Sequence, residues 1–331
     1  MLVAPGRLSL LAASSSGARV TQPHSAARTG VILGLAAYAA WGLLPLYFHA
    51  LANVFATEIV AHRILWSLLF LTFVAFAARR WAHIAAVLRR PRIALVLLAT
   101  AALIGINWTV YVYAVVSGHV VEGSLGYYLN PLVNVLLGVV FLKERLTRVQ
   151  AGAVLLAAAA VGVLALGAGG ALWISLLLAA SFALYGFVRK VAPVDALEGL
   201  YIETLFLAPL ALAWLLWLTG RGESHFLVER RTDLLLVLGG ALTAIPLLLF
   251  TAAAKRLAYS TLGFLQYISP TLQFLIGILV FGEPLGATRL ACFAAIWAAL
   301  ALFVAAGMHA ARRGAAGGRR RGGLEPPSCA V

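Results

Sequence analysis

Ten long apolar stretches follow one another along the chain, separated by short polar segments. Each is close to the roughly 20 residues that an α-helix needs to cross about 30 Å of hydrocarbon. The stretches mostly lack the polar stripe of a soluble helix, and none shows the alternating pattern of a membrane strand. They predict an all-α polytopic membrane protein with ten transmembrane helices, at residues 30–52, 57–78, 93–116, 122–142, 147–167, 171–188, 196–218, 234–254, 259–281 and 287–308.

The second half of the chain repeats the first. Tyr128–Asn134, with the sequence YLNPLVN, aligns with Tyr267–Gln273, with the sequence YISPTLQ. Two copies of five spans each must cross the membrane in opposite directions, because five is an odd number. Such an inverted repeat is the architecture of many secondary transporters. We therefore predict one five-helix repeat at residues 30–167 and a second at residues 171–308.

Composition argues against a soluble protein and suggests an orientation. Hydrophobic residues make up 63% of the chain and charged residues 11%, against roughly 45–50% and 25% in soluble domains. Of the 25 lysines and arginines, 20 fall on the termini and on the loops that share their side, four fall on the opposite loops, and Arg63 lies within a span. Because cytoplasmic loops carry the excess of positive charge, we predict a multi-pass inner-membrane protein with both termini in the cytoplasm. These loop anchors explain the net charge of +14, so nucleic acid is not a predicted partner.

The two ends of the chain lie outside the repeats. Residues 1–29 and the basic segment 309–331 are predicted to be disordered cytoplasmic extensions. For the first of these, a start codon assigned too early is a second interpretation. The cysteines, Cys292 in the last span and Cys329 in the tail, are not placed to form a disulfide with each other.

Charged residues inside the spans are the first candidates for function. Arg63 follows Glu58 and His62 at the start of the second span, about 9 Å into the membrane at 1.5 Å per residue. When Glu58 is aligned with Glu198, Arg63 falls opposite Glu203. The two charges enter from opposite faces, which argues against a direct ion pair. We predict that they face one shared cavity, where Arg63 recognises an anionic or polar group and Glu203 carries a coupling proton. Snorkelling of Arg63 to the nearer surface is the alternative.

Polar and aromatic residues elsewhere in the spans complete the predicted pathway. The two repeated prolines remove a helical hydrogen bond each and are predicted to kink their helices. Amides and hydroxyls lie beside them, and aromatic residues crowd the third span. The alternative is that these polar groups only join helices to one another. The predicted kinks are at Pro131 and Pro270, and the further pathway candidates are Asn107, Trp108, Tyr111, Asn130, Asn134, Gln266, Ser269 and Gln273.

Motifs of enzymes and metal sites are missing from the sequence. It contains no H-E-x-x-H, no G-x-S-x-G and no phosphate-binding G-x-x-x-x-G-K-[ST]. No catalytic residue, cofactor or metal is therefore predicted. The main rival to a transporter is a membrane-embedded enzyme that acts on a lipid or lipid-linked substrate through Arg63, His62, Glu58 and Glu203. A scaffold or sensor without transport is a third interpretation.

Four segments carry a resemblance to a known family. They are Leu43–Tyr47, Glu58–Ser67, Gly126–Gly138 and Thr261–Phe274. Together they resemble the RarD-type permeases, which belong to the EamA-like division of the drug/metabolite transporter superfamily. The resemblance extends over residues 30–308 and leaves out both ends of the chain.

That resemblance implies ten helices in two inverted five-helix repeats, and a permease of a group that exports metabolites and drugs. It also implies a link to chloramphenicol sensitivity, but it supplies no set of ligand residues. We therefore predict a secondary transporter of a small molecule that works by alternating access within the lipid bilayer, with export the favoured direction. The substrate and the coupling ion are left open, and so is a homodimer.

Overall fold

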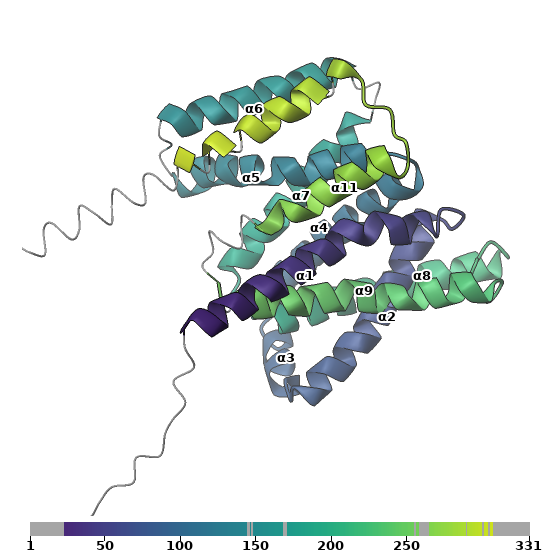
Figure 1. Ribbon diagram of the computed structural model, residues 1–331. Coiled ribbons are helices and arrows are strands. Elements are labelled where there is room, and N and C mark those ends of the chain that lie inside the picture. Colours follow the sequence, from purple (N-terminus) through teal and green to yellow (C-terminus); the bar gives the residue numbers. More distant parts are fainter. Residues whose placement is uncertain are drawn as a thin grey trace, which may run out of the picture.

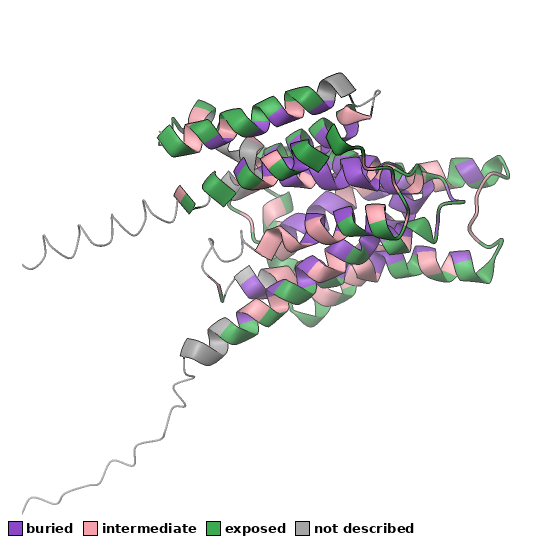
Figure 2. Ribbon diagram, turned by 45° about the horizontal axis from the view of Figure 1, so that its top comes forward, coloured by how far each residue is buried: buried purple, intermediate pink, exposed green. Residues whose placement is uncertain are grey.

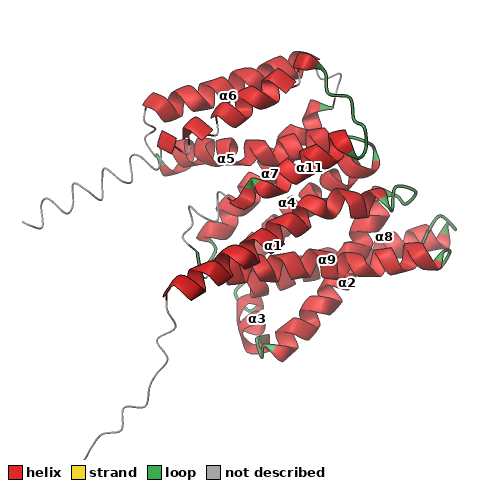
Figure 3. Cartoon of the chain, viewed as in Figure 1, coloured by secondary structure: helices red, strands yellow, loops and turns green. Residues whose placement is uncertain are grey.

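The chain folds into a bundle of α-helices (Figures 1 and 3). The computed structural model describes residues 23–143, 146, 148–167, 171–254, 256–257, 265–288, 290–299, 301–303 and 305–306, and these contain helices, turns and short loops but no strand. The helices are α1 (Pro23–His49), α2 (Ala56–Ala77), α3 (Trp81–Leu88), α4 (Pro91–Val116), α5 (Val120–Leu142), α6 (Arg148–Gly167), α7 (Leu172–Val191), α8 (Ala196–Gly220), α9 (Arg230–Ala254) and α11 (Ile268–Leu279).

Length and hydropathy place this bundle in a membrane. Within the described residues, six helices are long and apolar enough to cross a bilayer, namely α1, α2, α4, α7, α8 and α9. Shorter apolar helical segments cover Arg148–Leu164, Ile268–Leu279 and Leu290–Phe303. Part of the predicted span 259–281 lies outside the described residues, which resume at residue 265. The predicted class, an all-α polytopic membrane protein, is confirmed.

Burial follows the same division between interior and lipid. Figure 2 shows buried residues gathered where helices face one another and exposed residues on the outer faces. Many exposed residues are large and apolar, such as Phe73, Phe76, Leu155 and Leu210, each with at least 70% of its surface accessible. Water would disfavour so much open apolar surface, whereas lipid tails accept it.

A short helix that the hydropathy pattern does not predict connects two spans. The pattern predicts no helix between residues 78 and 93, but α3 occupies Trp81–Leu88. Arg79 takes a positive φ of 54° and turns the chain into it. Ile84 is buried, and the ring of Trp81 packs edge-on against Tyr201 of α8 at 5.5 Å. Eight residues are too few to cross the bilayer, so the span prediction passes over a helix that packs beside the bundle.

Most of the helix packing joins one half of the chain to the other. Helix α2 lies against α8 and α9, and α1 lies against α9 and α11. Helix α4 lies against α7 and α8, and α5 lies against α7 and α11. The interior of the bundle is therefore also the interface between the two halves.

A pair of glycines in α9 allows one of these contacts to be especially close. A Cβ atom on Gly240 would lie 2.5 Å from the carbonyl carbon of Trp66 and 2.8 Å from the nitrogen of Ser67, both in α2. Ser67 donates a hydrogen bond from its hydroxyl to the Gly240 carbonyl at 3.3 Å. Because backbone atoms cannot move aside as a side chain can, only glycine fits between α2 and α9 here.

Adding one methyl group at this contact should separate the two helices. We expect Gly240→Ala to lower the stability of the folded protein by about 1–3 kcal/mol, the usual effect of overpacking. Gly186→Ala is the matched control, since no atom lies within 4 Å of a Cβ at that helical position. Thermal unfolding in detergent measures both, and equal unfolding temperatures for the two variants would contradict the close contact.

Candidate functional site

Arg63 lies in the middle of the interface between the halves. It is on α2, with 5% of its surface accessible, and its Nε donates a hydrogen bond to Oγ1 of Thr243 on α9 at 3.0 Å. Its guanidinium carbon is 5.0 Å from the ring centroid of Phe48 and 5.4 Å from that of Trp108. A cation over aromatic faces gains about 0.5–2 kcal/mol per contact, depending on how far it is removed from water.

A second glycine of α9 makes room for this arrangement. A Cβ on Gly239 would lie 2.6 Å from the hydroxyl oxygen of Tyr47 and 3.0 Å from Cγ of Arg63. Tyr47 uses that hydroxyl to donate to the carbonyl of Leu235 at 2.8 Å. The absence of a side chain at position 239 thus lets Tyr47 and Arg63 approach the α9 backbone together.

Aromatic residues of α4 and α5 continue the cluster. The ring of Tyr111 lies 6.0 Å from Phe48 and 5.4 Å from Tyr127, both edge-on. The Tyr111 hydroxyl is buried and has no hydrogen-bond partner in the described part of the chain. The structure therefore brings the predicted residues Trp108 and Tyr111 to Arg63.

Asn107 lies one residue before Trp108, but its amide atoms already make hydrogen bonds with residues other than Arg63. Its Nδ2 donates to the carbonyl of Leu178 at 3.1 Å and to the hydroxyl of Ser181 at 3.0 Å, and its Oδ1 accepts from Tyr127 at 3.3 Å. These bonds hold α4 and α5 against α7. In this conformation the Asn107 amide joins helices, which is the alternative that the sequence leaves open.

Glu203 of α8 has a different set of partners. It is fully buried and accepts hydrogen bonds from Thr100 at 2.7 Å and Tyr185 at 3.1 Å. Arg189, at the end of α7, brings its Nε to 3.5 Å from the same carboxylate. Arg63 is not among its contacts in the described residues. The two charges that the repeat aligns are thus held by separate groups, and Arg189 is a partner that the sequence analysis assigns only to the cytoplasmic loops.

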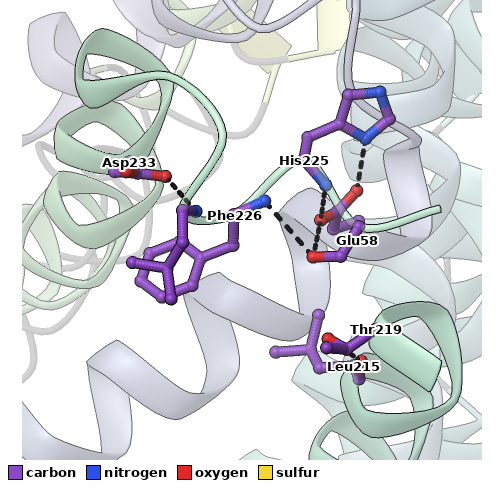
Figure 4. Close-up of polar contacts among 8 residues, drawn as sticks. Glu58, Leu215, Thr219, His225, Phe226 and Asp233 are labelled. Carbon is purple, nitrogen blue, oxygen red and sulfur yellow. Dashed lines mark hydrogen bonds and ion pairs between the residues drawn. The ribbon is translucent and has the colours of Figure 1, made fainter. Parts of the chain in front are cut away.

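Glu58 begins α2 and binds the loop between α8 and α9 (Figure 4). Its carboxylate accepts hydrogen bonds from the hydroxyl of Ser224 at 3.0 Å and from the backbone nitrogen of His225 at 2.8 Å. Nδ1 of His225 lies 2.8 Å from the other carboxylate oxygen. One turn further along α2, the His62 ring packs against Phe226 at 4.7 Å. The structure thus places Glu58 and His62 against this loop.

Glu198, which begins α8, makes the corresponding contact with the turn after α2. Arg80 donates from Nε to Glu198 at 2.5 Å and from Nη2 to Asp195 at 2.6 Å. The hydrogen bond and the charge of Glu198 raise the pKa of Arg80 above its ordinary value. Because Glu198 is buried, this ion pair is less screened by solvent than a surface pair.

The repeated proline segments lie in α5 and at the start of α11. Pro270 is in the first turn of α11 and follows a turn at Tyr267, with helical residues at 265 and 266 before that turn, so the predicted kink at Pro270 stays a prediction. Pro131 and Asn134 lie within α5, but their side chains are outside the described residues. Gln266 lies just before α11 and is partly exposed.

Two amides of these segments are buried with unused hydrogen-bonding atoms. Asn130 is fully buried, and neither amide atom has a partner among the described residues. Gln273 donates from Nε2 to the carbonyl of Trp41 at 3.2 Å and to Ser269 at 3.1 Å, while its Oε1 is unpartnered there. Asn130 and Gln273 therefore stay candidates for contact with a polar ligand.

Glu283 holds the start of α5. Its two carboxylate oxygens accept hydrogen bonds from the backbone nitrogens of Val120 at 2.6 Å and Val121 at 2.8 Å. A carboxylate at a helix N-terminus satisfies free N–H groups and complements the helix dipole. The repeat equivalent, Glu144, lies outside the described residues.

Comparisons with known proteins give consistent results. The model of the EamA-like transporter family matches residues 28–166. The chain is 44% identical to an uncharacterized transporter of Vibrio cholerae serotype O1, over 89% of this chain and 99% of that one. It is also 44% identical to Protein RarD of Escherichia coli strain K12, over 86% of this chain and 97% of that one. A protein of known crystal structure shares the fold, with a TM-score of 0.54 and 21% identity over 83% of this chain and 97% of that chain.

The contact between Glu283 and α5 can be tested by its removal. We expect Glu283→Ala to destabilise the protein by about 1–3 kcal/mol, since it leaves two backbone N–H groups without their acceptor. Glu223→Ala is the control, because Glu223 lies in a surface loop and its carboxylate pairs, among the described residues, with the exposed Arg221 alone. Thermal unfolding in detergent compares them, and an equal small effect of both substitutions would show that Glu283 does not anchor α5.

Proposed function

Because the chain belongs to the EamA-like transporter family, and within it to the RarD-type permeases, we propose that it is a secondary transporter of small metabolites or drugs. In this proposal ten spans form two inverted five-helix repeats in the inner membrane, with both termini in the cytoplasm. The two repeats move relative to each other and open a central site to one side at a time, with export as the favoured direction.

The pattern of helix contacts supports the inverted repeat. Sequence alignment pairs α1 with α7 through residues 36–42 and 180–186, α2 with α8, and α5 with α11, and chain order pairs α4 with α9. Exchanging each helix for its equivalent turns the α1–α9 contact into α7–α4, α2–α9 into α8–α4, and α1–α11 into α7–α5. All of these contacts occur. The main contacts between the halves are therefore unchanged by the exchange, as a two-fold axis requires.

Two further contacts join a helix to its own equivalent, as happens on such an axis. One is α2 with α8, and the other is α5 with α11. At the second, the equivalent residues Tyr128 and Tyr267 stack with centroids 6.4 Å apart and an angle of 18° between their planes. The Tyr128 hydroxyl also bonds to Thr271 of α11 at 2.6 Å.

The observation that carries alternating access is a reciprocal pair of contacts at opposite ends of α2 and α8. Glu58 begins α2 and binds the loop that follows α8, through Ser224 and His225. Glu198 begins α8 and binds the turn that follows α2, through Arg80. We call these the Glu58 contact and the Glu198 contact. Equivalent glutamates thus bind equivalent loops, and in the proposal these two loops lie at opposite faces of the membrane.

In the proposed orientation the Glu58 contact lies outside and the Glu198 contact inside. In this proposal the form in which both contacts are made is closed on both faces. Opening to one side then requires one contact to break while the other holds α2 and α8 together. The two contacts hold equivalent positions in the repeat but differ in chemistry, because one uses a histidine and a serine and the other an arginine.

The rival function, a membrane-embedded enzyme, has less support. It requires Glu58, His62, Arg63 and Glu203 to meet at one substrate. Glu58 and His62 face the loop after α8, and Glu203 is held by Thr100, Tyr185 and Arg189. The name of the matching family and that of the Vibrio cholerae relative also favour transport.

Cysteine labelling from each side tests the alternating contacts. Thr243→Cys, in a chain with Cys292→Ala and Cys329→Ala, places one thiol beside Arg63. We expect Glu58→Gln to raise its labelling by an impermeant maleimide several-fold from outside only, and Glu198→Gln to raise it from inside only. Intact cells and inverted vesicles supply the two sides.

Glu223→Gln serves as the control, because the side chain of Glu223 pairs with Arg221 and with no other described residue. Labelling that rises from the same side in both variants, or in neither, would contradict the assignment of one contact to each face.

Transport itself is tested with chloramphenicol, which is neutral, and with organic acids, in inverted vesicles with an imposed proton gradient. We expect the wild type to accumulate at least one of these compounds, whereas Glu203→Gln should still exchange that compound but should not concentrate it, because Glu203 is proposed to carry the coupling proton. Equal accumulation by both proteins, with the same dependence on pH, would remove Glu203 from coupling.

A further inference from the structure

Arg63 is a buried cation that has no counter-ion among the residues that the structure describes. Its Nε bonds to Thr243, and no other hydrogen bond and no ion pair of Arg63 occurs among the described residues. The titratable side chains that interact with it electrostatically are three tyrosines, Tyr47, Tyr111 and Tyr127. The other deeply buried arginine contact, Arg189 with Glu203, does have its carboxylate. Burial of an unpaired charge is costly, so this position is not explained by stability.

Several hydrogen-bond donors at and near Arg63 have no acceptor among the described residues. The guanidinium carbon lies over the rings of Phe48 and Trp108, which accept no conventional hydrogen bond, and the Nη atoms at the edge of the guanidinium have no hydrogen-bond partner among the described residues. Tyr111, whose ring touches Phe48, has a buried hydroxyl without a partner in the described part of the chain. Tyr127 is different, because its hydroxyl is already used by Asn107.

We propose that the edge of Arg63 and the hydroxyl of Tyr111 bind the carboxylate, or another singly charged acid group, of an organic monoanion. A carboxylate fits the two parallel N–H groups of a guanidinium and accepts a further hydrogen bond from a hydroxyl. The remainder of the ligand is apolar, since Phe48 and Trp108 line the same region. One cation matches one negative charge, so an inorganic phosphate dianion is a poorer ligand. This inference rests on the proposed function, for which it names the class of substrate.

The stability of the empty protein gives a test that needs no ligand. Arg63→Met removes the charge but keeps an unbranched apolar chain, and Thr243 still has the Gly239 carbonyl as a partner at 2.8 Å. We expect the unfolding temperature of Arg63→Met in detergent to equal or exceed that of the wild type. Arg189→Met is the matched control and should unfold at a lower temperature, because it leaves the Glu203 carboxylate without its cation. A fall in Arg63→Met as large as that in Arg189→Met would overturn the inference.

Ligand binding is then measured by the rise in unfolding temperature with benzoate, hexanoate and 3-phenylpropionate, each beside its neutral amide and beside inorganic phosphate. We expect at least one acid to stabilise the wild type more than its amide and more than phosphate. The effect should be lost in Arg63→Met, and the apparent Kd should be roughly tenfold to hundredfold weaker in Tyr111→Phe if that hydroxyl donates to the charged group.

Three results would overturn the inference: amides that stabilise as well as the acids, an acid effect that survives Arg63→Met, or no effect of any acid. The proposed function fails separately. A protein that binds these acids in detergent but moves no compound across vesicles would contradict transport, whereas transport of chloramphenicol without binding of any acid would contradict only the monoanion site.

Discussion

A buried charge in a membrane protein has to be balanced by the protein itself, because lipid offers no partner for it. In this bundle α2 and α8 each have a buried glutamate in their first turn. The segment that follows one helix binds the glutamate of the other. Glu58 is bound by the loop after α8, and Glu198 by Arg80 after α2. The first turn of each helix is therefore held by the segment that follows the other helix. The rest of the interface between the halves is arranged around this exchange.

The same constraint makes Arg63 stand out. Glu203 is supplied with Thr100, Tyr185 and Arg189, whereas Arg63 receives one hydroxyl and two aromatic faces. Aromatic faces stabilise a cation but do not cancel its charge. In our proposal the substrate supplies the negative charge that pairs with this cation at the interface of the two halves. The interface between the two halves would then also be the place where the charge of the substrate is recognised.

The sequence predicts the helical membrane class and the position of most helices, because long apolar runs determine both. It also singles out Arg63, Trp108 and Tyr111, which the structure brings together, since a charge or an aromatic cluster inside an apolar run is visible in the sequence. It does not find the contacts between distant segments. Arg80, Arg189 and His225 are ordinary loop residues by composition, and only the packing of α2, α7 and α8 brings them to buried carboxylates. Helix α3 is missed for a related reason, because it is too short for a span and gains its burial from α4 and α8.

The central claim is that α2 and α8 hold each other at opposite faces and release one face at a time. Distances between spin labels test it directly, with one pair at Asn53 and Arg221 near the Glu58 contact and another at His83 and Pro193 near the Glu198 contact, all on exposed residues. The account predicts that Glu58→Gln lengthens only the first distance and Glu198→Gln only the second. Two distances that lengthen together in either variant would contradict it.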